Sequence, residues 1–198
     1  GSAAVQIAKS IGAIVIATAG GPEKCALVKE KLGADYTVDY LAHPKDWPNQ
    51  ILKIVSKIPG REKKPGVDVI YDPIGYFTLD TKCIAWNGRI LIVGFAGTPS
   101  AIDAVPANRL LLKGASLVGV FWGGSVLNEP AIVQRTWDGV FRLFEQNKNV
   151  RPLLFAQRYY GLRSVVDAME NLGSRKTYGK VVVDIQREEE NSRGVAKL

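Results

Sequence analysis

The sequence is poor in the residues that most often build metal and redox sites. Its 198 residues include two cysteines, one histidine and one methionine. Cys25 and Cys83 lie far apart, without a C-x-x-C spacing or a neighbouring histidine cluster, so they indicate neither a zinc site nor a disulfide framework. His43 stands in the segment "LAHPKDW", where we expect an ordinary loop residue. We therefore predict no metal site and a reducing compartment.

Long apolar runs are missing as well. Runs such as "RILIVGFAG" are much shorter than the ~18 residues that a membrane-spanning helix needs, and the first residues are not typical of a signal peptide. These features predict a cytoplasmic protein without a membrane partner. The last three residues, Ala196, Lys197 and Leu198, resemble a C-terminal peroxisomal address, so the peroxisome is the alternative location.

The sequence also lacks the common motifs of hydrolytic enzymes. It contains no G-x-S-x-G, no H-E-x-x-H and no pair of carboxylates at a useful spacing. The formal net charge of +7 suits an anionic partner, but the basic residues are scattered apart from "REKK" at 61–64. No RNA-binding signature or aromatic platform accompanies them. We therefore expect a small anionic ligand and no nucleic acid.

Short runs rich in valine and isoleucine alternate with helical segments along most of the chain. This order is typical of an α/β fold with a parallel sheet covered on both faces. The predicted strands in this part span residues 13–19, 35–40, 67–72, 88–95 and 116–122. We therefore predict a Rossmann-like, doubly wound NAD(P)-binding domain over residues 1–150, a C-terminal segment over 151–185 and a charged, flexible tail over 186–198.

The predicted strands end in small or polar residues. The ends read "TAGG" at 18–21, "DY" at 39–40, "DPIG" at 72–75, "GFAG" at 94–97 and "GVFWGG" at 119–124. In doubly wound sheets the ligand lies across the carboxyl ends of the strands. One glycine there is most often only part of a turn, but several on one edge let backbone N–H groups approach a flat or phosphorylated ligand. We expect Gly20 to be one of these contacts.

The end of the first predicted strand favours one dinucleotide over the other. NAD sites place an acidic residue at this position to accept the ribose hydroxyls, whereas a 2′-phosphate requires a cation. Here the strand ends in Thr18, Ala19 and Gly20, and Lys24 follows on the first turn of a helix begun by Pro22. The helix N-terminus adds its own attraction for an anion. The pattern favours NADPH, although Lys24 could be a solvated helix residue and the neighbouring glutamate weakens the local field.

Several segments together resemble the cofactor domain of the medium-chain dehydrogenase/reductase superfamily, in particular its zinc-independent NADPH:quinone oxidoreductase, or zeta-crystallin-like, group. The resemblance covers residues 1 to about 185. It implies hydride transfer from NADPH to a quinone or another conjugated carbonyl. The segments that carry it are "AAVQIAK", "VIATAGGPEK", "LGAD", "VDVIYDPIG", "GRILIVGFAG", "VPANRLLLKGASLVGVFWG" and "GKVVVDI".

The resemblance also implies a set of cofactor contacts. Gly1 is similar to the last glycine of the family's pyrophosphate loop, and Gly21 stands where the family often has a serine. Each implied contact has a purely structural alternative as a core, cap or solvated residue, and no catalytic acid or base is named. The residues implied at the adenosine 2′-phosphate are Lys24, Tyr40 and Arg175, and those implied beside the nicotinamide are Phe95, Asn108, Val120, Phe121 and Trp122.

Compared with the family it resembles, the sequence has no first strand and little of the glycine loop before its first helix. Because that strand is central in the order 3-2-1-4-5-6, we expect a visible defect where it would stand, or closure of the gap by its neighbours. The substrate pocket is expected outside these residues. An enoyl or alkenal reductase and a non-enzymatic NADPH-binding or structural module therefore stay open beside the quinone reductase, and a homodimer is a further expectation.

Overall fold

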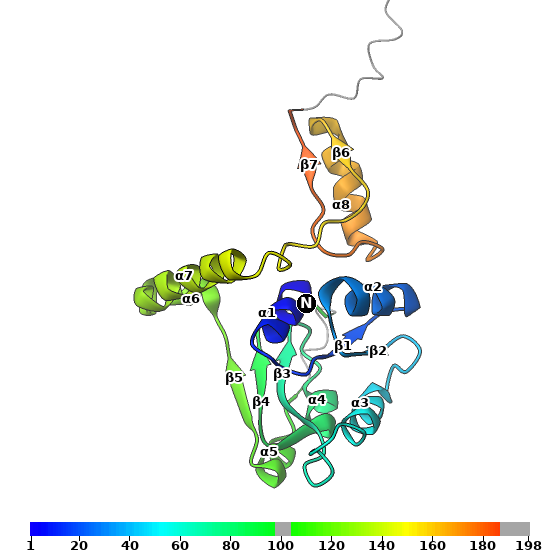
Figure 1. Ribbon diagram of the computed structural model, residues 1–198, viewed down its shortest axis with the longest axis vertical. Helices are drawn as coiled ribbons and strands as arrows, with labels where there is room; N and C mark the ends of the chain where they lie inside the picture. Colours follow the sequence, from blue (N-terminus) through cyan, green and yellow to red (C-terminus); the bar gives the residue numbers. More distant parts are fainter. Residues whose placement is uncertain (98–103, 187–198) are drawn as a thin grey trace, which may run out of the picture. The chain divides into compact units, whose positions relative to one another are not determined.

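The computed structural model describes residues 1–97 and 104–186 (Figure 1). Two compact units divide between Lys148 and Asn149, and each is described by itself. The tail from residue 187 onward, including the predicted peroxisomal address, lies outside the described residues. In the first unit the elements are α1 (Ser2–Ser10), β1 (Ile16–Ala19), α2 (Pro22–Leu32), β2 (Tyr36–Asp39), α3 (Trp47–Val55), β3 (Val67–Asp72), α4 (Phe77–Cys83), β4 (Ile84–Ile92), α5 (Ala107–Lys113), β5 (Ser116–Gly119), α6 (Trp122–Asn128) and α7 (Pro130–Gln146).

The strands of the first unit form two parallel sheets. One holds β1 and β2, paired from Ile16 with Tyr36 to Ala19 with Asp39. The other has the order β3-β4-β5. The predicted α/β class and parallel pairing are thus confirmed, but the single doubly wound sheet is not, because β1 and β3 are not hydrogen-bonded to each other. The interruption falls where the sequence analysis expects a defect.

Local sequence rules fix both ends of α2. Pro22 occupies the first turn, where its missing N–H would have no helical partner in any case. Gly33 closes the helix in the left-handed conformation (φ 78°), and the N–H of the next residue, Ala34, bonds to the carbonyl of Val28. Both features agree with the sequence-based prediction.

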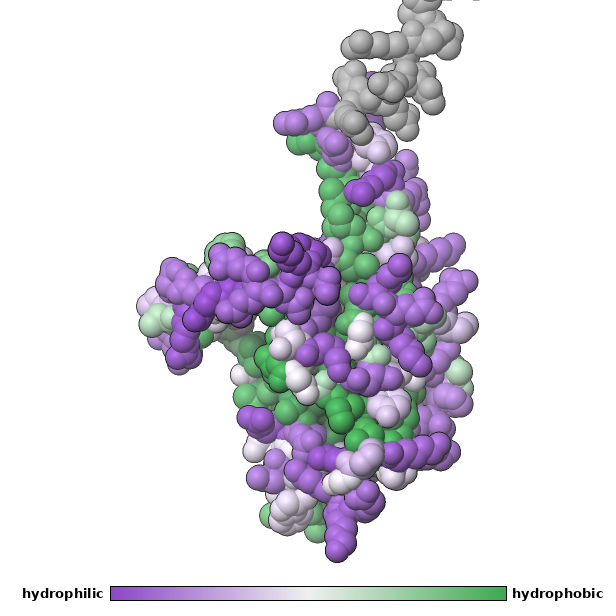
Figure 2. Space-filling view, viewed as in Figure 1, coloured by the Kyte–Doolittle hydropathy of each residue, from purple (hydrophilic) through white to green (hydrophobic). Residues whose placement is uncertain are grey.

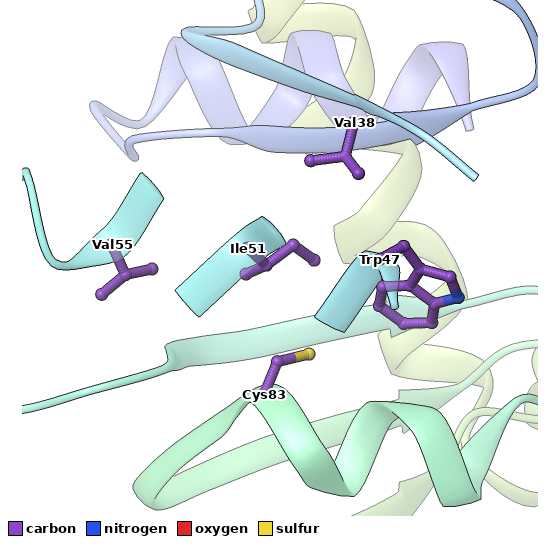
Figure 3. Packing of buried hydrophobic residues seen from close by; sticks show 5 residues of the cluster. All are labelled: Val38, Trp47, Ile51, Val55 and Cys83. Atoms are coloured by element: carbon purple, nitrogen blue, oxygen red, sulfur yellow. The ribbon is translucent and has the colours of Figure 1, made fainter. Parts of the chain in front are cut away.

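The main core of the first unit lies where α3 packs between the two sheets. Trp47, Ile51 and Val55 recur every four residues and so share one face of α3 (Figure 3). They form a buried cluster with Val38 of β2 and Cys83 of α4. Burial raises the pKa of the Cys83 thiol to about 12, and the negative charge of Asp80 adds to the effect. Cys83 therefore behaves as an apolar core residue.

One face of the three-stranded sheet is only partly covered. Val69 and Tyr71 alternate along β3 and are 44% and 47% exposed. Hydrophobic surface shows between the polar side chains over this part of the molecule (Figure 2). Parallel sheets are usually buried on both faces, so this exposure departs from the expected doubly wound arrangement.

Two strand boundaries differ from the sequence-based prediction. β4 begins at Ile84, four residues earlier than expected, and β5 ends at Gly119 instead of continuing through Trp122. Phe121 is the N-cap residue of α6, a helix that was not predicted. Its ring packs so closely on Gly124 that an added Cβ there would lie 2.5 Å from Phe121 Cδ1. The apolar run "SLVGVFW" contains one breaker, Gly119, and β5 ends at this residue, whereas the sequence-based prediction continued the strand past it.

The second unit is small. A two-residue strand β6 (Tyr159–Tyr160) pairs in parallel with β7 (Val183–Asp184), and an isolated bridge joins Leu154 to Lys180. A short 3₁₀ helix, η1 (Leu162–Ser164), leads into α8 (Val165–Gly173). Within the described ranges of both units, no helix is long and apolar enough to span a membrane.

Candidate functional site

The carboxyl ends of β1 and β2 lie side by side because the two strands are parallel and in register. The residues that follow them, Gly20 and Tyr40, therefore meet. A Cβ built on Gly20 would lie 2.7 Å from the Tyr40 hydroxyl and 3.0 Å from its Cζ, so only a hydrogen atom fits there. This places two of the predicted cofactor residues, from different strands, at one edge.

Asp39, the last residue of β2, ties these two strand ends together. Its Oδ1 accepts hydrogen bonds from the backbone N–H groups of Gly21 (2.9 Å), Leu41 (2.9 Å) and Ala42 (3.3 Å). These bonds, the one from Gly21 first, hold the pKa of the Asp39 carboxyl below its ordinary value, against a smaller effect of desolvation. The edge thus carries a fixed negative charge at neutral pH.

Lys24 lies in the first turn of α2, the helix that begins beside this same edge. It is half-buried, and the helix that carries it begins right after Gly21, whose backbone (φ 87°, ψ 155°) is a conformation that is close to glycine-only. The serine that the family often has at this position would be strained in this conformation. Gly20 and Lys24 therefore stand on the turn from β1 into α2, and Tyr40 reaches this turn from the end of β2.

A second group of residues gathers after β3 and β4. The buried carboxylate of Asp72 accepts hydrogen bonds from the backbone N–H groups of Ile74 (2.7 Å), Gly75 (2.9 and 3.1 Å) and Tyr76 (3.0 Å). The resulting loop bonds to the loop after β4, because Ala96 N–H donates to the Pro73 carbonyl at 2.8 Å. The two strand ends are thereby joined by backbone bonds.

Phe95 stands on this joined pair of loops. Its ring is half-exposed, meets the ring of Phe77 edge-on at 6.2 Å, and lies 3.1 Å from where a Cβ on Gly75 would be. An aromatic ring fixed on one side and open to solvent on the other can border a planar ligand. Because Phe95 is held by contacts with other loops, its position depends on the Asp72 network.

The residues after β5 lie beside the same edge of the three-stranded sheet. Val120 N–H donates to the carbonyl of Ile92, the last residue of β4, at 2.9 Å. Phe121 and Trp122 follow at the start of α6 and are 81% and 43% exposed. Three predicted residues are therefore placed next to the end of β4, on a turn and helix start in place of the expected strand.

Three further predicted residues belong to other parts of the chain. Gly1 is the exposed N-cap residue of α1. Asn108 is exposed in the first turn of α5, the helix that leads into the amino end of β5, and no hydrogen bond among the described residues links it to Phe95 or Trp122. Arg175 belongs to the second unit, where it is exposed and has a positive φ of 60°.

Sequence reasoning named no role for Asp39 or Asp72, although both stand at strand ends that it singled out. A signal was present, because an aspartate directly before a turn often bonds to the backbone N–H groups that follow it. The side chains of both residues organise the loops that carry the predicted contacts. They are therefore part of the site's framework.

These features define the class of the protein: an α/β nucleotide-binding domain of the Rossmann type, with parallel strands, intervening helices and an edge lined by glycines. The comparisons then give the family. The model of the zinc-binding dehydrogenase family matches residues 1–146, and the chain belongs to this family, as a cofactor-binding domain of the medium-chain dehydrogenase/reductase superfamily.

Three relatives illustrate the match. A quinone oxidoreductase-like protein 2 homolog from Nematostella vectensis is 32% identical over 189 residues, covering 94% of this chain and 48% of that protein. The quinone oxidoreductase of Thermus thermophilus, solved also with NADPH, has a TM-score of 0.72 and 26% identity, covering 93% of this chain and 54% of its own. An NAD-dependent alcohol dehydrogenase has a TM-score of 0.70 and 30% identity, covering 93% and 47%. The chain spans about half the length of the relatives it matches.

The family description names zinc, and the described residues do not offer a site for it. Within residues 1–97 and 104–186 there is no group of three or more histidine, cysteine, aspartate or glutamate residues that could hold a metal ion. Cys25 and Cys83 belong to different helices, and neither is in a disulfide bond.

Proposed function

We propose that this chain is the cofactor-binding part of an NADPH-dependent oxidoreductase that transfers hydride to a quinone or another conjugated carbonyl. The observation that carries the proposal is the carboxyl edge of β1 and β2, where the Tyr40 ring packs closely against Gly20 and Lys24 follows at the start of a helix. Quinone oxidoreductases among the relatives, one of them solved with NADPH, support the same function.

The residues fit the dinucleotide in two groups. Lys24 and Tyr40 would bind the adenosine 2′-phosphate end, with Arg175 as a third contact, and Gly1 would lie near the pyrophosphate. Phe95, Val120, Phe121 and Trp122 would border the nicotinamide, with Asn108 as a further contact. When bound, NADPH supplies a hydride, which carries two electrons to the acceptor and converts NADPH to NADP⁺. The acceptor then takes up a proton. The protein residues bind and orient the dinucleotide and the acceptor and exclude water from the space between them. No protein nucleophile is required.

Stopped-flow oxidation of NADPH by the full-length protein tests this function. We expect faster turnover with 9,10-phenanthrenequinone than with enals such as 2-hexenal. The reverse order would favour an enoyl or alkenal reductase. Retained NADPH binding without turnover of either acceptor would contradict the enzyme and leave a binding or structural module.

We further propose that in the full-length protein one more parallel strand lies between β1 and β3. Each of these strands has a single hydrogen-bonded neighbour, while Ile16 of β1 and Ile70 of β3 pack against the same buried cluster. Unpaired backbone groups in such a position cost roughly 1 to 3 kcal/mol each, so a strand that pairs with both edges is strongly favoured. Hydrogen exchange tests this: slow exchange of amides on the free edges of both strands is expected, and rapid exchange there would exclude the extra strand.

We also propose that the protein forms a homodimer. β5 is an edge strand in the described sheet, and the apolar side chains of Phe121 and Leu127 beside it are 81% and 86% exposed, which favours pairing of two copies there. Light scattering that gives a monomer mass at micromolar concentration would exclude the dimer.

The cytoplasm stays the predicted location, and the peroxisome is the alternative. Imaging of fusions with and without the last three residues would distinguish the two locations.

A further inference from the structure

A carboxylate from the neighbouring strand is bonded to the loop that should receive the 2′-phosphate. Asp39 reaches from the end of β2 to the N–H of Gly21, at the start of α2, and so takes one of the backbone donors that would otherwise face an anion. All three of its backbone bonds end on Oδ1, and among the described residues Oδ2 accepts no hydrogen bond. Half-buried and bonded in this way, the carboxylate cannot swing away without breaking the loop.

Two opposite charges, on Lys24 and Asp39, would therefore act on the 2′-phosphate end of the dinucleotide. Lys24 favours a phosphate, whereas the ionised Asp39 repels it and can accept a hydrogen bond from a ribose 2′-hydroxyl through Oδ2. We propose that Asp39 is a specificity-determining residue that weakens the preference for NADPH and lets the site accept NADH as well. This inference rests on the proposed function, because it concerns the same cofactor edge.

The experiment removes the negative charge of Asp39 and preserves the hydrogen bonds that hold the loop. In Asp39→Asn the amide oxygen can still accept the bonds from Gly21, Leu41 and Ala42, so the geometry persists while the repulsion ends. Fluorescence titration of the full-length protein should give a dissociation constant for NADPH that falls about three- to tenfold, as expected for one charge acting on a phosphate through a high dielectric, while the constant for NADH does not fall. A ratio of the two constants that matches the wild type would overturn the inference.

Asp68→Asn is the matched control. Asp68 lies near the opposite, amino end of β3, where it forms exposed ion pairs with Arg61 and Lys64. The substitution makes the same change in net charge and should leave the ratio of the two constants within twofold of the wild type. An equal shift in this variant would show that Asp39→Asn acts through net charge alone, against the inference.

A second measurement needs no variant. We expect the wild-type protein to bind 2′,5′-ADP less than about thirtyfold more tightly than 5′-AMP, because the repulsion offsets part of the attraction by Lys24. A preference above a hundredfold would overturn the inference while supporting the proposed function. Failure of NADPH, NADH and both fragments to bind would reject the proposed function itself, and the inference with it.

Discussion

At the scale of single residues, two aspartates hold the loops on which the candidate site stands. Asp39 and Asp72 are the last residues of β2 and β3, and each carboxylate accepts three or more backbone hydrogen bonds from the residues that follow or face it. Such bonds to an ionised acceptor are stronger than neutral ones. The positions of Tyr40 and Phe95 therefore depend on side chains that do not themselves need to touch a ligand.

Gly20 offers a direct test of the edge at this scale. In Gly20→Ala the new methyl group would meet the end of the Tyr40 ring, which can rotate away, so the fold should lose no more than about 1 kcal/mol while the ring leaves its position. We expect the dissociation constant for NADPH to rise at least tenfold in a fluorescence titration.

Gly139→Ala on α7 is the control for this substitution, because an added Cβ there has no neighbour within 4 Å. It should leave NADPH binding within twofold of the wild type. A Gly20→Ala variant that binds NADPH as the wild type does would remove Gly20 and Tyr40 from the cofactor site.

Asp35 gives a pH-dependent contribution to stability. Its carboxylate accepts hydrogen bonds from the Lys9 ammonium at 2.8 Å and from the Val15 N–H at 2.7 Å, and so joins α1 to the residue directly before β1. Burial alone would raise the pKa of this carboxyl, but these bonds outweigh it and leave the pKa below the ordinary value. A lowered folded-state pKa stabilises the protein above the unfolded value near 4, and this stability is lost as the pH falls through the folded pKa.

The expected result for Asp35→Asn is a loss of roughly 1 kcal/mol in the free energy of unfolding at pH 7, since the pair is partly exposed. The difference from the wild type should shrink below pH 4. Urea unfolding at several pH values measures it, and a difference that stays constant down to pH 2 would argue against the ionised pair.

At the scale of elements, the turn from β3 into α4 depends on the Asp72 carboxylate. In Asp72→Ala the N–H groups of Ile74, Gly75 and Tyr76 lose their acceptor, and the free energy of unfolding should fall by about 2 to 4 kcal/mol. Asp68→Ala on the same strand removes only exposed ion pairs and should cost about 0.5 kcal/mol. Equal losses in urea unfolding would show that the Asp72 bonds contribute little.

The elements also show how far sequence reasoning extends. The ends of α2 were predictable because Pro22 and Gly33 act through local backbone rules. The end of β5 was not, because the turn at Val120 depends on a hydrogen bond to Ile92 and on the packing of Phe121, neither of which has a local signature. The same holds for the candidate site: its glycines were visible in the sequence, but the carboxylate of Asp39 beside them depends on how two strands lie in register.

At the scale of the whole molecule, the parallel strands are divided between separate sheets. The sequence predicts an interruption between the strands now called β1 and β3, and the two are indeed not paired. The partial exposure of one face of the three-stranded sheet was not foreseen, because local patterns do not show which helix covers which face. Both features agree with a chain that spans about half the length of its relatives.

The central claim is that the carboxyl edge of these strands holds a dinucleotide with a 2′-phosphate near Lys24. Equilibrium titration of the full-length protein with NADPH and NADH, monitored by nicotinamide fluorescence, tests it most directly. The account predicts a lower dissociation constant for NADPH and a loss of that advantage in Lys24→Ala. Tighter binding of NADH, or binding of neither dinucleotide, would contradict it.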